Sequence, residues 1–400
     1  MAERAPWLTI VGLGEDGLNG LSDASRDALS RAEIVMGAGR HLALLPDLDC
    51  EVLEWPVPFS DGIELLLAQR GRRVVMLASG DPFWFGAGTS VTRHLPREDW
   101  VALPAPSAFS LAAAQLGWPL ESVACLGLHA APLTRLRPYL ARGVRVLVLL
   151  RDGAAVGGLA GYLAGLGFGD SRLHVMEALG GGRARVRLAV AGDYALHDVA
   201  HPVLVGLEVA GAGAAMPVVA GLPDEMFAHD GQITKKAVRA LSLSALAPRA
   251  GEMLWDIGAG SGSVGIEWVL AHPSLRAIGF EMNAARAARA RENAHNLGAD
   301  RLHVIEGRAP QVLQDQPLPD AVFIGGGMSE RMLEQLWDML PQGVRVVANA
   351  VTLESEALLA QWHARAGGNL MRLEMAEAAP LGGRRGWRAA YPIVQWSVAR

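Results

Sequence analysis

A glycine loop between a predicted strand and a predicted helix is the feature that most constrains the fold of this chain. The apolar run EMLWDI at 252–257 leads directly into GAGSG at 258–262, and residues 264–271 continue with helical spacing. Glycines at alternate positions allow the backbone to turn tightly and to approach a ligand closely. The helix that follows offers free N–H groups and the positive end of its dipole to an anion. The loop therefore predicts a site for a carboxylate or a phosphate.

Strand and helix patterns alternate along most of the chain, which predicts an α/β fold. In the first half, apolar runs at 8–12, 74–78 and 144–150 are typical of buried parallel strands. Residues 22–31 have helical spacing, with Ser22 as the expected N-cap. The second half begins a new alternation, with strands expected at 252–257, 276–281, 301–307, 320–326 and 345–351 and helices at 234–248, 264–272, 284–298 and 331–340.

The stretch 211–229 marks the expected boundary between two domains. It is rich in small residues and proline and has no sustained periodicity, so we interpret it as a linker. The chain has 400 residues, which is more than a single core usually organises. We therefore expect one α/β domain at 1–210 and a second, doubly wound domain at 230–400.

Charge and composition exclude several classes of protein. The formal net charge of −5 gives no general attraction for nucleic acid or anionic lipid, so neither is expected as a partner. Two cysteines, Cys50 and Cys125, cannot form a disulfide framework. The stretch 202–222 contains Glu208 and Pro217, so we interpret it as a buried strand and a linker rather than a membrane span. With no signal-peptide pattern at its start, the chain is expected in the cytoplasm.

The spacing of the glycine loop disfavours a dinucleotide. The fingerprint G-x-G-x-x-G would require a third glycine at Ser263, whereas here the third glycine is Gly262. The next predicted strand ends in Glu281, where an acid can accept hydrogen bonds from both hydroxyls of a ribose. Loop and acid together predict a nucleoside that carries a small carboxylate.

The pattern D-x-G-x-G-x-G at 256–262, followed by Glu281, resembles the first two motifs of the class I S-adenosylmethionine-dependent methyltransferases. The resemblance implies a Rossmann-like class I fold, with the methionine carboxylate at the loop and the ribose at Glu281. A glycine-rich turn that only packs remains the alternative. The cofactor contacts implied by the resemblance are Thr234, Gly258, Ala259, Gly260, Ser261, Gly262, Glu281, Arg308 and Ala309.

The first half carries a separate set of turn motifs. Residues 12–17, GLGEDG, formally match G-x-G-x-x-G, but the next predicted strand ends in Gly37 instead of an acid, which disfavours a dinucleotide here too. A sharp turn is expected at 80–82, GDP, because glycine and proline punctuate the end of a predicted strand. Ser107 is placed to cap a helix and to direct its hydroxyl into the same crevice.

Taken in order, IVGLGEDG, AEIVMGAGRHL, VVMLASGDPFWFG and PAPSAFSLAAAQLG resemble the tetrapyrrole methylase family over about 7–210. That family has a distinct methyltransferase fold and also uses S-adenosylmethionine. The first loop departs from the GPGDP pattern of many such methylases. The cofactor contacts implied by this resemblance are Gly12, Gly14, Gly80, Asp81, Ser107 and Ala108.

The order of the two domains resembles the fused methyltransferases of corrin-ring assembly in cobalamin biosynthesis. The resemblance implies an enzyme with two S-adenosylmethionine sites per chain and a small-molecule tetrapyrrole as substrate. The apolar excess of the chain allows a multimer, and a homo-oligomer is expected. Its N-terminal domain would methylate carbon 5, and its C-terminal domain would methylate carbon 15 and release carbon dioxide from the ring C acetate. No metal is expected, because Pro202 and a β-rich run directly follow His197 and His201. A catalytically silent binding domain and an RNA methyltransferase remain the alternatives.

Three groups in the second half are candidates for contact with such a substrate. A triple glycine at 325–327 leaves room for a bulky flat molecule against the backbone. Arginines in GGRRGWR suit its carboxylates, and an asparagine at a predicted strand end is a candidate catalytic group. An ordinary turn and a solvated charge run remain the alternatives for the glycines and the arginines. The residues assigned are Gly325, Gly326, Gly327, Arg384, Arg385 and, with less emphasis, Arg388 as substrate contacts, and Asn349 as the catalytic group.

Overall fold

The computed structural model describes residues 5–400, which divide into two compact units. The N-terminal unit extends to Ala214. The C-terminal unit comprises Ala215–Arg400 together with the short segment Pro132–Pro138.

The segment at 211–229, predicted as a linker, contributes to the core of the C-terminal unit. In the described structure it contains neither an α-helix nor a strand. Met216, Leu222 and Phe227 are nevertheless buried there. An irregular segment can bury apolar side chains without any periodicity in its sequence, so the sequence pattern did not reveal this packing.

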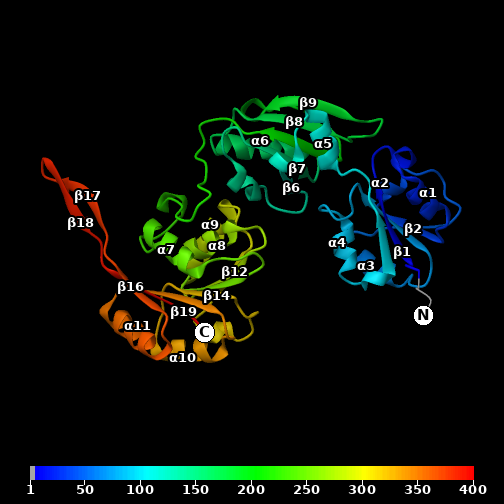
Figure 1. Ribbon diagram of the computed structural model, residues 1–400. Helices are drawn as coiled ribbons and strands as arrows, with labels where there is room; N and C mark the ends of the chain where they lie inside the picture. Colours follow the sequence, from blue (N-terminus) through cyan, green and yellow to red (C-terminus); the bar gives the residue numbers. More distant parts are fainter. Residues whose placement is uncertain (1–4) are drawn as a thin grey trace. The chain divides into compact units, whose positions relative to one another are not determined.

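A five-stranded parallel sheet forms the first part of the N-terminal unit (Figure 1). Its spatial order is β3-β2-β4-β1-β5, and its strands are β1 (Leu8–Leu13), β2 (Ile34–Gly37), β3 (Glu51–Glu54), β4 (Val74–Ser79) and β5 (Trp100–Leu103). The central strands β1 and β4 are apolar and almost entirely buried, as expected for strands covered on both faces. Because Leu13 pairs with Ser79, the carboxyl ends of β1 and β4 lie side by side.

A second five-stranded sheet completes the N-terminal unit. Its order is β6-β7-β10-β8-β9, and its strands are β6 (Ala124–Gly127), β7 (Arg145–Leu150), β8 (Arg172–Glu177), β9 (Arg185–Val190) and β10 (Val203–Glu208). The strand predicted at 144–150 is confirmed as β7, but the expectation of parallel neighbours is only half right. β7 pairs parallel with β6 and antiparallel with β10. A strand buried on both faces has the same apolar pattern whichever way its neighbours run.

Two serine caps predicted from the sequence begin helices of the N-terminal unit. Ser22 Oγ accepts a hydrogen bond from Ser25 N at 3.2 Å, and Ser107 Oγ accepts one from Ser110 N at 3.1 Å. Each cap satisfies a backbone N–H that has no partner within its helix. The helices of this unit are α1 (Asp23–Ser30), α2 (Gly39–Leu42), α3 (Asp61–Leu67), α4 (Ala87–Thr92), α5 (Ala108–Leu116) and α6 (Ala154–Gly165).

The C-terminal unit is built on a seven-stranded sheet of order β13-β12-β11-β14-β15-β19-β16. The strands are β11 (Met253–Ile257), β12 (Arg276–Glu281), β13 (Leu302–Glu306), β14 (Ala321–Ile324), β15 (Arg345–Ala350), β16 (Asn369–Leu373) and β19 (Ile393–Ala399). The first five strands in this order are parallel, which confirms the doubly wound arrangement, and β19 runs antiparallel to both of its neighbours. The order reverses at β11, where ligands bind in doubly wound sheets.

Helices flank this sheet (Figure 1). They are α7 (Lys236–Leu246), α8 (Ser263–Ala271), α9 (Ala284–Asn296), α10 (Glu330–Met339) and α11 (Leu353–Ala366). One apolar core joins side chains of α7, α8 and α9 to the sheet, and a second joins those of α10 and α11. Because successive side chains of a strand point to opposite faces of the sheet, they pack into two cores, one on each face. The carboxyl ends of the strands remain available for a ligand-binding site.

A two-stranded hairpin of β17 (Ala376–Leu381) and β18 (Arg384–Ala389) projects from the C-terminal unit (Figure 1). Its strands pair only with each other and are largely exposed. No strand was expected in this part of the chain from its sequence. Among residues 5–400, no helix is long and apolar enough to cross a membrane.

Candidate functional site

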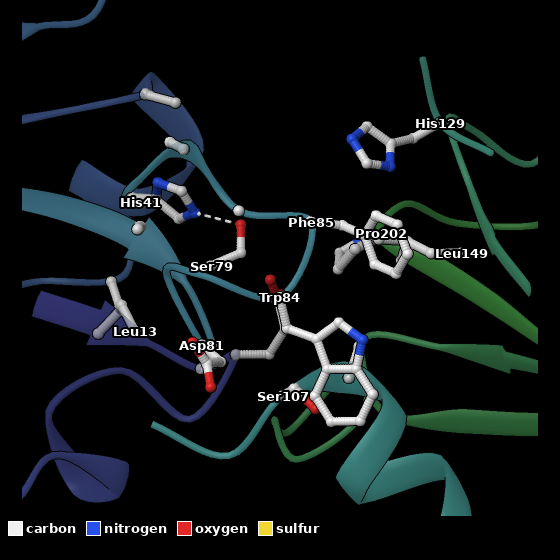
Figure 2. A pocket seen from close by; sticks show the side chains of 18 of the residues that line it. Leu13, His41, Ser79, Asp81, Trp84, Phe85, Ser107, His129, Leu149 and Pro202 are labelled. Atoms are coloured by element: carbon white, nitrogen blue, oxygen red, sulfur yellow. Dashed lines mark hydrogen bonds between the residues drawn. The ribbon is translucent and has the colours of Figure 1, made fainter. Parts of the chain in front are cut away.

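A cavity of about 650 Å³ lies in the N-terminal unit, where β1 and β4 end and α5 begins (Figure 2). This volume is within the usual range for small-molecule sites. Of the six positions assigned there from the sequence, all but Gly12 line the cavity. They are Gly14, Gly80, Asp81, Ser107 and Ala108.

Backbone contacts around Gly80 shape the floor of this cavity. Gly80 N donates a hydrogen bond to Leu13 O at 3.0 Å, and Ala105 N donates one to Gly80 O at 3.1 Å. The backbones are so close that a Cβ on Gly12 would lie 2.0 Å from Gly80 O. Gly12 therefore lies behind the cavity lining and does not contact the cavity itself. Only a residue without a side chain at this position allows the turn after β4 to pack against β1.

Asp81 and Ser107 organise the two turns that face each other across the floor. Asp81 Oδ1 accepts a hydrogen bond from Phe83 N at 2.8 Å, which holds the turn that follows β4. Ser107 is 6% exposed and caps α5, as described above. Both side chains thus fix backbone that lines the cavity.

A polar cluster beside these turns was not identified from the sequence. Ser79 Oγ lies 3.1 Å from His41 Nε2 and also accepts a hydrogen bond from Arg40 (Figure 2). Arginine can only donate, so Ser79 Oγ is the acceptor in that bond, and the hydroxyl keeps one hydrogen and one lone pair with which it can pair with either neutral tautomer of His41. Burial, together with the nearby charge of Arg40, lowers the pKa of His41 to about 3. The cavity therefore contains an uncharged imidazole at neutral pH.

Glu15, which lines the same cavity, binds Arg40 from the cavity lining and the more exposed Arg183. Arg40 Nη1 donates to Glu15 Oε1 at 2.9 Å, and Arg183 Nη2 donates to Glu15 Oε2 at 2.8 Å. The Glu15 side chain is 9% exposed, so this ion pair is shielded from water more than most surface pairs are. Two cations on one anion leave a net positive charge, which suits a substrate rich in carboxylates.

The glycine loop of the C-terminal unit is tied to the neighbouring strand and to the triple glycine. Gly258 N and Ala259 N both donate to Phe280 O, at 2.9 and 3.1 Å. A Cβ on Gly258 would lie 2.8 Å from Gly326 N, so the two backbones touch. Gly325 N donates to Ile257 O at 2.9 Å. The structure therefore brings the predicted cofactor loop and the predicted substrate glycines together.

Glu281 closes the loop from the adjacent strand. Its two carboxylate oxygens accept hydrogen bonds from Gly260 N and Asn283 N, each at 2.9 Å, and the residue is 6% exposed. Each carboxylate oxygen has a further lone pair. The backbone bonds thus orient the acid and leave acceptors for ribose hydroxyls.

A buried ion-pair network positions the segment that contains Thr234. The Arg239 side chain is fully buried, and its Nε donates to Glu267 Oε1 at 2.6 Å. A second guanidinium nitrogen donates to the carbonyl oxygen of Thr234. Gln232 O lies 3.9 Å from the position of a Cβ on Gly260, so this segment passes beside the glycine loop.

Asp256 at the end of β11 is buried directly below the loop. It is 1% exposed, and its Oδ2 accepts a hydrogen bond from Gly265 N at 2.9 Å. Burial, with a smaller contribution from the charge of Glu281, raises the pKa of Asp256 to about 7. The acid of the sequence pattern therefore supports the first turn of α8 from inside the protein.

The remaining assigned residues occupy separate places. Asn349 Nδ2 donates to Ser242 Oγ at 2.9 Å, and Asn349 Oδ1 accepts from Gln395 Nε2 at 3.0 Å, so its amide joins β15 to α7 and β19. Arg308 is exposed after β13, and Ala309 packs against the second core. Ser261 is buried, and its carbonyl oxygen accepts a hydrogen bond from Asn293 in α9 at 2.8 Å. Arg384, Arg385 and Arg388 lie in the exposed β17–β18 hairpin, apart from α8 in Figure 1.

Both halves of the chain match known families. Residues 7–194 match the Tetrapyrrole (Corrin/Porphyrin) Methylases, and residues 225–400 match a Precorrin methyltransferase domain. A precorrin-6Y C(5,15)-methyltransferase (decarboxylating) of Sinorhizobium sp. is 48% identical over 398 residues, covering 98% of this chain and 96% of the relative. A protein of the same name from Mycobacterium tuberculosis is 39% identical over 405 residues, covering 98% of this chain and 100% of the relative.

A shorter relative matches part of the chain. It is a probable cobalt-precorrin-6B C(15)-methyltransferase (decarboxylating) of Saccharolobus solfataricus, 36% identical over 146 residues that cover 34% of this chain and 73% of the relative.

The two folds and the matches to their families define a two-domain methyltransferase that uses S-adenosylmethionine. Because the long relatives match along nearly the whole chain, the family is also defined. The chain belongs to the precorrin-6Y C(5,15)-methyltransferase (decarboxylating) family.

The residues present in both units fit S-adenosylmethionine. In the C-terminal unit, Glu281 offers acceptors to a ribose, and the loop at 258–262 is followed by the N-terminus of α8, which favours a carboxylate. The contact between Gly258 and Gly326 leaves no space for a side chain at the loop, which keeps main chain exposed to the ligand. In the N-terminal unit, Gly80 and Ser107 provide a similar backbone cradle at the cavity.

Proposed function

We propose that this chain is a bifunctional methyltransferase that converts precorrin-6Y by adding methyl groups at carbons 5 and 15 and by removing the ring C acetate carboxyl group as carbon dioxide. One observation carries the proposal. A single chain contains two separate sites built from backbone at the carboxyl ends of parallel strands, namely the cavity of the N-terminal unit and the glycine loop of the C-terminal unit. The relatives of the same name along the full length support the substrate.

We assign carbon 5 to the N-terminal domain at 1–210 and carbon 15 with decarboxylation to the C-terminal domain at 230–400, joined by 211–229. The shorter relative is named as a probable C(15)-methyltransferase (decarboxylating) and matches 34% of this chain, which supports this division. It follows that each chain binds S-adenosylmethionine at two sites. We place the enzyme in the cytoplasm as a homo-oligomer.

The chemistry asks little of side chains beyond alignment. When bound, S-adenosylmethionine supplies an electrophilic methyl group. The enamine-like carbons of a reduced tetrapyrrole are nucleophilic, and holding two reactants in line is worth effective molarities of about 10⁵–10⁸ M. The glycine turns at Gly80 and Gly258 fix the cofactor side of this alignment, and the arginines on Glu15 receive substrate carboxylates.

In the C-terminal site, the room beside the triple glycine accommodates the edge of the macrocycle. A Cβ on Gly326 or Gly327 would meet no atom within 4 Å. The ring system next to carbon 15 can accept the electron pair that carbon dioxide leaves behind, so methylation and decarboxylation can share this site. Asn349 stays a prediction as a catalytic group, because its amide already bonds to Ser242 and Gln395.

Product mass spectrometry tests the proposal. The intact chain, given precorrin-6Y and S-adenosylmethionine with a labelled methyl group, should form a product with two labelled methyl groups and one carboxyl group fewer. Gly260→Val should stop carbon 15 methylation and decarboxylation together, and Gly80→Val combined with Asp81→Ala should stop only carbon 5 methylation. Decarboxylation that persists in Gly260→Val would contradict the division of labour.

A further inference from the structure

We propose that Trp84 and Phe85 form the wall of the N-terminal cavity that contacts the flat face of the macrocycle and thereby sets its affinity. The inference rests on the proposed function of the N-terminal domain. Both residues line the cavity. Neither was identified as a site residue from the sequence.

These two rings remain accessible although they are large and apolar. Trp84 is 36% exposed and Phe85 is 48% exposed. Exposed apolar surface inside a concave site is typical of a ligand contact. Within residues 5–400, the indole N–H of Trp84 has no hydrogen-bond partner, so it is free to donate to a polar group on a ligand.

The backbone at Phe85 is held in a strained conformation. Phe85 has a φ of +56°, which is uncommon for a bulky residue and costs free energy. The turn around it is fixed at both ends, because Phe83 N donates to Asp81 Oδ1 at 2.8 Å and Gly88 N donates to Pro82 O at 3.0 Å. A strained residue that lines a cavity is the arrangement found where a fold fixes a side chain for binding.

Contacts from two other elements keep both rings in place. The rings of Trp84 and Phe85 pack on the buried ring of Phe109 in α5, with centroids 5.2 and 5.8 Å apart. Phe85 also lies directly against the backbone of β6, since a Cβ on Gly127 would be 2.7 Å from the ring. The aromatic wall is therefore already formed, and little side-chain freedom is lost when a ligand binds.

The Ser79–His41 pair lies across the cavity from the apolar group around Phe85. Figure 2 shows Ser79, His41 and Asp81 with the apolar Leu13 on one side, and Phe85, Leu149 and Pro202 with His129 on the other, with the indole of Trp84 between them. A reduced tetrapyrrole has a flat, apolar ring face and carboxylates at its edge, so this division fits it. Aromatic rings favour stacked or tilted contact with such a face.

Phe83 provides a matched control in the same loop. It is 43% exposed, much like its two neighbours. Its ring instead packs against Trp100, with centroids 5.4 Å apart, and it does not line the cavity. Loss of the Phe83 ring therefore removes a comparable apolar group from the loop without touching the proposed wall.

The experiment measures carbon 5 methylation of precorrin-6Y by the full chain, with KM determined separately for precorrin-6Y and for S-adenosylmethionine. We expect Trp84→Ala and Phe85→Asn each to raise the KM for precorrin-6Y by about tenfold, because a lost aromatic contact is worth up to about 1.5 kcal/mol. Asparagine tolerates a positive φ, so Phe85→Asn should fold normally. Trp84→Phe should restore most of the affinity.

Phe83→Ala should leave both KM values within about twofold of wild type, since its ring lies outside the cavity. A kcat for carbon 5 methylation near the wild-type value at saturating precorrin-6Y, with an unchanged KM for S-adenosylmethionine, reports that the N-terminal unit of each variant is folded. An unchanged KM for precorrin-6Y in Trp84→Ala and Phe85→Asn would overturn the inference, as would an equal rise in Phe83→Ala or a rise confined to S-adenosylmethionine. If wild type itself forms no carbon 5 product, the proposed function fails instead.

Discussion

The backbone amide of Gly260 donates a hydrogen bond of 2.9 Å to Glu281 Oε2, which links the glycine loop to the end of the neighbouring strand. The other oxygen of the same carboxylate accepts Asn283 N at 2.9 Å. One buried acid thus fixes the backbone on two sides and still presents lone pairs to a ribose. The geometry of the loop and the recognition of the nucleoside depend on the same side chain.

Glu281→Gln should weaken S-adenosylmethionine binding in the C-terminal unit. The side-chain NH₂ group would face one of the two backbone N–H groups, and an unsatisfied buried donor costs about 1–3 kcal/mol, or roughly 5- to 150-fold in affinity. Calorimetry of the full chain measures the loss. Glu306→Gln is the control, because Glu306 pairs with Glu281 in the sheet but is exposed. Equal affinities in wild type and Glu281→Gln would show that Glu281 does not bind the cofactor.

Gly12→Ala should abolish carbon 5 methylation and preserve carbon 15 methylation. The new Cβ would lie 2.0 Å from Gly80 O and 2.5 Å from Ala105 N, and neither backbone atom can move without opening the cavity floor. We expect a loss of about 1–3 kcal/mol in the stability of this unit. Gly161→Ala in α6 is the control, since a Cβ there meets no atom within 4 Å. Normal carbon 5 methylation in Gly12→Ala would contradict this account of the floor.

The pKa of His41 makes the N-terminal unit less stable in acid. The pKa is about 3 in the folded protein against an ordinary value of 6.5, so between these values the unfolded chain binds a proton that the folded chain does not. Stability should therefore fall as the pH drops from about 6.5 to about 3, by as much as about 5 kcal/mol. His41→Gln should flatten this dependence, whereas the same change at the exposed His94 should not. Urea titrations read by pulsed hydrogen exchange of β4 peptides give the measurement.

Asp256 should give the C-terminal unit the opposite pH dependence. Its pKa is raised from 3.8 to about 7, so the folded chain binds a proton that the unfolded chain releases between these values. The contribution to stability is present below about pH 4 and declines by about 4 kcal/mol as the pH rises to 7. Asp256→Asn keeps an acceptor for Gly265 N and should remove the decline. Pulsed hydrogen exchange of β11 peptides that shows the same slope in both proteins would refute the assignment.

Local features of the sequence predicted much of the fold. The apolar runs became strands within two residues of the expected bounds, and Ser22 and Ser107 cap the predicted helices. Such features depend on neighbours in the chain, so periodicity and cap residues are sufficient to find them.

Pairings between distant segments were not predictable in the same way. β19 inserts between β15 and β16 and runs antiparallel to both, and the β17–β18 hairpin follows exposed residues with no apolar face. The placement of β19 depends on contacts between distant segments, and the hairpin strands have no alternation of apolar and polar residues, so neither produces a recognisable local pattern in the sequence.

In the candidate sites too, residues in local motifs were predicted, whereas residues brought together from distant segments were not. The glycine turns and Glu281 were found because backbone shape and charge recur at fixed spacing. His41 from α2 and Phe85 from the loop after β4 come together only in the folded cavity, and their sequence neighbourhoods show no motif that connects them.

Calorimetric titration of the intact chain with S-adenosylmethionine tests most directly whether one polypeptide carries two methyl-transfer centres. We predict two binding sites per chain in wild type, two in Glu281→Gln with one of them weakened, and one in the Gly80→Val, Asp81→Ala double variant. A stoichiometry of one in wild type, with both methylations of precorrin-6Y intact, would contradict the account.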